Sequence, residues 1–98
     1  MIDLKVLFDR LPGEIERLHA CGTEPRLAED RSKLVITIDA LDFEGTVSAW
    51  LNGCCDIDLI RRGARARDGK AWHGEFSDTE AAIQALVAVI ELLPELPE

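Results

Sequence analysis

Alternation of apolar and polar residues in the middle of the chain restricts the fold more than any other feature. Between residues 34 and 59, apolar side chains recur at every second position in three separate runs. A period of two places them on one face of a β-strand, whereas a helix needs a period near 3.6. That face carries Leu34, Ile36, Ile38, Ala40, Val47, Ala49, Cys55, Ile57 and Leu59. The sequence therefore predicts three half-buried strands.

The Asn52-Gly53 pair predicts a hairpin between the second and third of these strands. A two-residue loop would put the apolar residues of the two strands on opposite faces of the sheet. A three-residue loop over residues 51–53 instead pairs Trp50 with Cys54 and keeps the apolar residues together. It also places Gly53 where the backbone needs a left-handed conformation. We therefore expect the three-residue loop.

Two further segments bear on the size of the sheet. The Asp68-Gly69 pair marks a second hairpin, which leads into a fourth strand at residues 70–76. Residues 23–33 are polar and contain Pro25. We expect a connection there, with room for a short edge strand.

A helix is predicted at the start of the chain. Apolar side chains recur at three- and four-residue spacing from Leu4 to Leu18, which is the pattern of one buried helix face. Pro12-Gly13 interrupts this pattern, so one kinked helix or two short helices would each fit. Gly22 provides a stop signal.

The clearest helix is predicted at the other end of the chain. Ser77 and Glu80 have the spacing of a capping box. Residues 81–93 are apolar except for Gln84 and Glu91, and Pro94 ends the helix. An apolar surface this wide is covered either by the sheet and the first helix or by a second copy of the chain.

These elements predict one α+β domain over residues 1–98. Its order is helix, four-stranded antiparallel meander, helix, in two layers with both helices on one sheet face. The other sheet face is then open.

The charge of the chain is strongly negative and unevenly distributed. The formal net charge is −8, while the stretch at residues 61–70 is rich in arginine. A body this acidic repels nucleic acid and anionic membranes and attracts basic proteins. We therefore expect no nucleic-acid partner, although the role of the basic stretch is left open by the sequence.

Several features indicate a cytoplasmic protein. There is no run of about 18 apolar residues that could form a membrane helix. The first ten residues carry charges among their apolar positions, unlike a signal peptide. The three cysteines are an odd number, which fits free thiols in a reducing compartment.

Residues that could carry chemistry form no recognisable motif. His19, Cys21, Cys54, Cys55 and His73 have the atom types that bind zinc, but no Cys-x-x-Cys spacing is present. We expect neither a metal ion nor a cofactor.

A nucleophilic enzyme can be imagined from Cys54 or Ser48, with His73 as the base and Asp56 or Asp58 to orient it. No Gly-x-Ser-x-Gly elbow or cysteine-protease signature supports it. An open sheet face also lacks the pocket that excludes water. We therefore expect no enzymatic activity.

The open face of the predicted sheet is the best candidate for a binding surface. Its central aromatic, Trp50, is surrounded by acids and hydroxyls, as in a protein interface with an anchor inside a polar rim. Coverage of Trp50 by a helix, as part of the core, is the alternative. The candidate partner-binding residues are Asp39, Thr46, Ser48, Trp50, Asp56 and Asp58.

The central stretch resembles the immunity proteins of the TriTu type. It comprises residues 45–59 (GTVSAWLNGCCDIDL), with residues 74–77 (GEFS) and the last helix. The family pattern runs as a glycine, a tryptophan, a turn of a small residue and glycine, and an acid-rich alternating strand. Pro12-Gly13 and the arginine-rich stretch depart from it.

The resemblance implies an antidote in a bacterial polymorphic-toxin or contact-dependent inhibition system. Such a protein binds the toxic domain of a cognate effector in the cytoplasm and blocks it. Many of these toxins are basic nucleases, which an acidic chain would suit. A homo-oligomeric structural or adaptor domain, which associates through residues 81–93, is the alternative function.

Overall fold

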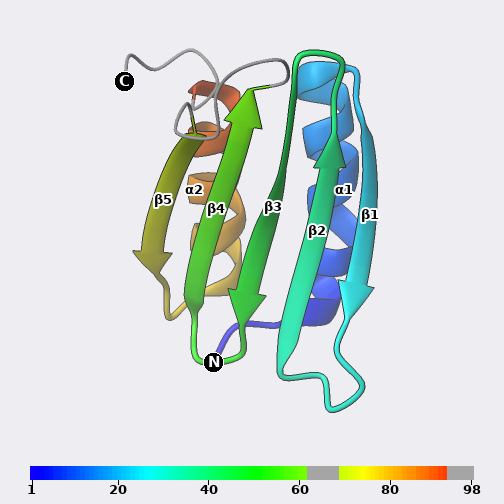
Figure 1. Cartoon of the computed structure of the whole chain (residues 1–98). Coiled ribbons are helices and arrows are strands. Elements are labelled where there is room, and N and C mark those ends of the chain that lie inside the picture. The colour runs from blue at the N-terminus through cyan, green and yellow to red at the C-terminus, as the bar shows by residue number, and fades with distance from the viewer. Residues whose placement is uncertain (62–68, 93–98) are drawn as a thin grey trace.

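The computed structural model describes residues 1–61 and 69–92 and confirms the α+β class. A single antiparallel sheet, in the order β1-β2-β3-β4-β5, is covered on one face by both helices (Figure 1). The elements are α1 (Leu4–His19), β1 (Gly22–Leu27), β2 (Lys33–Asp39), β3 (Phe43–Trp50), β4 (Cys54–Arg61), β5 (Gly69–Glu75) and α2 (Thr79–Leu92). None of the helices among these residues is long and apolar enough to span a membrane.

The sheet has five strands, so the prediction of a four-stranded meander is wrong. The additional strand is β1, which pairs with β2 along its whole length and forms one edge of the sheet. Its burial alternates, but its sequence, GTEPRL, has only one large aliphatic side chain, so the hydrophobic signal of a strand is weak. Pro25 is tolerated because an edge strand leaves half of its N–H groups without a sheet partner. The strand forms because α1 packs against it, a tertiary contact that local sequence does not report.

The predicted hairpin between β3 and β4 is confirmed in its register. Ala49 lies opposite Cys55, and the loop comprises the three residues between Trp50 and Cys54. Gly53 has a φ of +98°, in the region that favours glycine. The inward side chains of β2, β3 and β4 consequently share one face.

The first helix is continuous through Pro12 and Gly13. Its buried stripe holds Leu4, Leu7, Leu11 and Ile15 against the core on both sides of the proline, which offsets the loss of one backbone hydrogen bond. The predicted stop at Gly22 is wrong, because Gly22 already begins β1. The helix ends instead at His19, and its C-cap residue Ala20 adopts the left-handed conformation (φ 50°).

The core lies between the helices and the inner face of the sheet. It contains no buried polar or charged side chain among the described residues. Its fully enclosed members come from both helices and the three central strands: Leu7, Leu11, Ile15, Leu34, Ile36, Ile38, Val47, Cys55, Ile57, Ile83, Leu86 and Ile90.

The strand predicted at 70–76 is confirmed as β5, with both ends one residue earlier. Other predictions concern segments outside the described residues. Asp68 of the expected turn, most of the basic stretch at 61–70, and Pro94 after the last helix all lie outside the described ranges.

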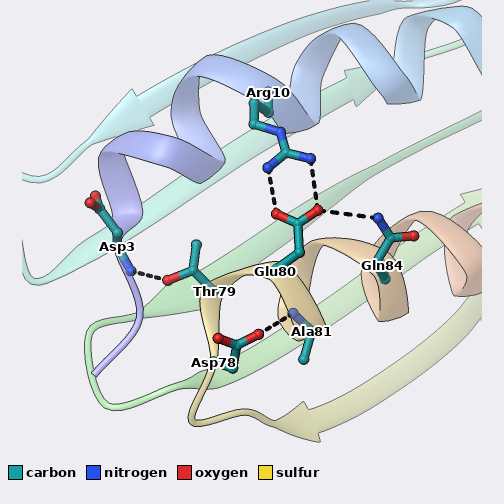
Figure 2. A network of polar contacts seen from close by, with 7 residues as sticks. All are labelled: Asp3, Arg10, Asp78, Thr79, Glu80, Ala81 and Gln84. Atoms are coloured by element: carbon teal, nitrogen blue, oxygen red, sulfur yellow. Dashed lines mark hydrogen bonds and ion pairs between the residues drawn. The ribbon is translucent and has the colours of Figure 1, made fainter.

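The start of α2 is joined to the start of α1 by polar contacts (Figure 2). The Asp3 backbone N–H donates to Thr79 Oγ1 at 2.9 Å. The Arg10 guanidinium donates two hydrogen bonds to Glu80, at 2.6 and 3.0 Å. Glu80 is therefore not the second half of a capping box, as the sequence suggested; it reaches across to the other helix.

The cap of α2 is Asp78, not Ser77. Its carboxylate accepts a hydrogen bond from the Ala81 N–H at 2.9 Å, the geometry of an N-cap residue. Asp78→Ala should lower the free energy of unfolding by about 1 kcal/mol, measured by urea denaturation. Ser77→Ala is the matched control and should be nearly neutral. Equal losses in the two variants would contradict this assignment.

Candidate protein-binding face

The sheet face opposite the helices, here called the open face, consists of the outward side chains of all five strands. Cross-strand pairing and alternation in burial identify these side chains. No helix among the described residues lies over them (Figure 1). They are Glu24, Arg26, Lys33, Val35, Thr37, Asp39, Glu44, Thr46, Ser48, Trp50, Cys54, Asp56, Asp58, Ile60, Ala71, His73 and Glu75.

All six candidate partner-binding residues lie on the open face. Thr46 is directly opposite Asp58, and Ser48 is directly opposite Asp56. Trp50 follows Ser48 on the same side of β3. Asp39 lies at the end of β2, one pair beyond the row of Thr37 and Thr46. The alternation pattern therefore brought the six side chains to one face. The expectation of a central aromatic surrounded by all of them is wrong, because Trp50 ends β3 beside the hairpin whereas Asp39 lies at the opposite end of the sheet.

Trp50 belongs to the open face and not to the core. It is half-buried, and it is not among the side chains packed against the core. The Lys33 ammonium lies 4.7 Å from the centroid of its ring. The tryptophan that packs against the core is Trp72 of β5, which stacks on Phe76 with ring centroids 6.1 Å apart.

Carboxylates dominate the electrostatics of the open face. Its described side chains include six carboxylates against two full cations, Arg26 and Lys33. Arg26 is paired with Glu24 at 2.7 Å. Asp39 and Glu44 also take part in interactions within the chain. A surface of this charge attracts a basic partner and raises its rate of association.

One end of the open face is hollowed into a shallow depression of about 730 Å³. Three candidate residues line it, namely Asp39, Thr46 and Asp58. The sequence did not nominate Glu24, Thr37 and Glu44, which also line it. Glu24 was missed because residues 23–33 were expected to form a connection with at most a short edge strand, to which no faces were assigned. Thr37 is placed on this face by its alternation with Ile36 and Ile38, although it was not among the candidate residues.

Four polar side chains of β4 and β5 form a cluster on the same face. His73 Nδ1 lies 2.5 Å from Asp56 Oδ1, and His73 Nε2 lies 3.9 Å from Glu75 Oε1. The Cys54 thiol donates to Glu75 Oε1 at 3.6 Å. The hydrogen bond to Asp56, with the charges of Asp56 and Glu75, raises the pKa of His73 above its ordinary value of 6.5.

Cys54, His73 and Asp56, which the sequence suggested as a nucleophile, a base and an orienting acid, come together in this cluster. Their chemistry is nevertheless poorly suited to nucleophilic catalysis. Desolvation, followed by the hydrogen bond to Glu75 and the charges of Glu75 and Asp56, raises the pKa of the Cys54 thiol. A thiol with a raised pKa is a weak nucleophile near neutral pH, because the thiolate is the reactive form. The His73 side chain is more than half exposed, so no enclosed site surrounds it.

Asp56→Asn is expected to lower the pKa of His73 towards 6.5, as measured by NMR titration of its ring proton. Because the pKa of His73 is raised in the folded state, its pair with Asp56 stabilises the fold below about pH 6.5. That contribution is lost as the pH rises through the folded-state pKa. The variant should therefore be less stable than the wild type in mildly acidic solution and equally stable above that pKa. An unchanged His73 titration would show that the pair does not form in solution.

The residues with zinc-binding atom types do not come together as one group. Cys54 and His73 share the cluster on the open face, and the others lie elsewhere. The His19 ring Nε2 donates to the Ile90 carbonyl at 2.9 Å. Cys55 is buried on the core side, where desolvation raises its pKa to about 11, while Cys54 lies on the open face. Within residues 1–61 and 69–92, no group of three or more histidine, cysteine and acidic side chains is placed to hold a metal ion.

Comparison of the chain with models of known families, with curated proteins and with solved structures gives no match.

Proposed function

We propose that this chain is a cytoplasmic immunity protein, which binds the toxic domain of a cognate bacterial effector through its open face and thereby blocks it. One observation carries the binding role. Trp50 shares with Asp56 and Asp58 a sheet face that none of the described helices covers. The identification of the partner as a toxin rests on the resemblance of residues 45–59 and 74–77 to the TriTu-type immunity proteins.

The shape and charge of the open face favour a protein partner over other ligands. The face is broad, and its depression is shallow and lined by carboxylates and hydroxyls, whereas small-molecule sites are enclosed and mostly apolar. The net charge of −8 opposes nucleic acid. A basic toxin domain, such as a nuclease, has the complementary charge.

Self-association through α2 receives less support from the described residues. Its large apolar side chains Ile83, Leu86 and Ile90 are buried in the core. Its solvent-facing side is formed by Ala81, Gln84, Ala88 and Glu91, and Leu92 is its one large exposed apolar residue within the described part. Extensive dimer interfaces need a larger apolar area than this.

Co-purification of the tagged chain with the products of its neighbouring genes tests the proposal. The expected result is a stable one-to-one complex with a protein domain that is toxic when expressed alone and harmless when co-expressed with this chain. Recovery of the chain only with itself, as a dimer, would contradict the immunity function and favour the structural or adaptor function.

A further inference from the structure

The ring of Trp50 already holds a cation. Lys33 lies directly opposite Trp50 in the pairing of β2 with β3, and its ammonium is 4.7 Å from the ring centroid. The face of an indole ring attracts cations through its quadrupole. This contact shows that the exposed side of the ring is accessible to a positive group and oriented to receive one.

The other basic side chains of the open face contact carboxylates. His73 lies 2.5 Å from Asp56, and Arg26 is paired with Glu24 at 2.7 Å. Among the described residues, each basic side chain of the open face therefore contacts a group that attracts positive charge. A basic partner has to replace these internal contacts when it docks.

We propose that Trp50 receives an arginine side chain of the partner protein, and that this arginine displaces Lys33 from the ring. This inference rests on the proposed function and names the chemistry of the contact at Trp50. A guanidinium is planar and weakly hydrated and stacks on aromatic rings, whereas the ammonium of Lys33 is compact and strongly hydrated. Arginine is therefore the cation best able to displace it.

The surroundings of Trp50 provide acceptors for the edges of a guanidinium. Asp56 lies opposite Ser48, the residue two before Trp50 on the same side of β3. Glu75 lies opposite Cys54, which follows the hairpin loop and continues the row of Lys33 and Trp50. Asp56, on the neighbouring strand, is the nearer of the two carboxylates, and a guanidinium stacked on the ring can donate an N–H group towards it in place of His73.

The test uses the ¹⁵N-labelled full chain and N-acetyl-arginine amide as the probe, at constant ionic strength. The indole N–H signal of Trp50 should shift on titration, while that of Trp72, which packs against the core, serves as the internal reference. Lys33→Gln removes the competing cation and should raise the affinity for the probe by about two- to fivefold, the size of an exposed cation–π contact. N-acetyl-lysine amide should bind more weakly than the arginine probe.

Arg26→Gln is the matched control, because it removes one positive charge from the same face away from Trp50. An equal gain in probe affinity in both variants would show that net charge alone causes the effect, and it would overturn the proposal. Weaker probe binding in Lys33→Gln, or the absence of a selective shift of the Trp50 signal, would also overturn it. The outcome is separable from that of the proposed function. If the chain binds the probe but captures no toxin, the arginine site stands and the immunity function is contradicted. If it captures a toxin but does not bind the probe at Trp50, only the arginine site is contradicted.

Discussion

Gly53→Ala should destabilise the protein by about 3 kcal/mol, a large share of the stability of a domain of this size. Gly53 has a φ of +98°, which an alanine adopts only with strain. A Cβ atom there would also lie 1.8 Å from the Phe76 carbonyl oxygen. Relief of that clash would open the contact in which the Phe76 N–H donates to the Gly53 carbonyl at 2.9 Å, and a lost backbone hydrogen bond adds about 1 kcal/mol.

Gly13→Ala provides the control for this experiment. Gly13 lies within α1, and a Cβ atom there would meet no atom within 4 Å. Alanine in a helix interior is more favourable than glycine, so this variant should be more stable than the wild type by about 0.5–1 kcal/mol. Chemical denaturation of both variants measures the contrast. A Gly53→Ala protein as stable as the wild type would contradict the loop geometry.

The combined substitution of Trp50, Asp56 and Asp58 by alanine should weaken binding to the captured partner by at least about 100-fold. Aromatic anchors at the centre of an interface commonly contribute about 2 kcal/mol or more, and removal of two carboxylates slows the association of a basic protein. All three side chains point away from the core, so the variant should remain folded. Calorimetry measures the affinity, and circular dichroism checks the fold.

Gln84 and Glu91, both exposed on α2, provide the control surface for the triple variant. Their double alanine variant should bind the partner as the wild type does, because α2 lies on the other side of the sheet (Figure 1). Loss of binding in this control, together with wild-type affinity in the triple variant, would place the interface on the helices.

The central strands could be predicted from sequence because each has one buried and one open face. In β2, β3 and β4 this asymmetry appears directly as alternation, and it fixes the hairpin register and the side of the sheet on which Trp50 lies. Strand β1 lacks the signal, because its formation depends on α1 and on an edge position. Glu24, which extends the row of Thr46 and Asp58 to the edge of the sheet, was therefore missing from the predicted site.

Contacts between distant segments were equally invisible in the sequence. Ser77 and Glu80 have the spacing of a capping box, but in the structure Asp78 caps α2. Glu80 instead accepts hydrogen bonds from Arg10, 70 residues away. The pair of His73 and Asp56 depends on the register of β4 with β5, which their spacing in the sequence does not provide. Local patterns therefore located the open face, and tertiary geometry decided which of its groups interact.

The most direct test of the central claim is to map the interface by NMR, with the ¹⁵N-labelled chain titrated with the unlabelled partner captured by co-purification. The perturbed signals should belong to the outward residues of β2, β3 and β4 and include the indole N–H of Trp50, while those of α2 stay unchanged. Perturbations concentrated on Gln84, Ala88, Glu91 and Leu92, with Trp50 unchanged, would contradict it.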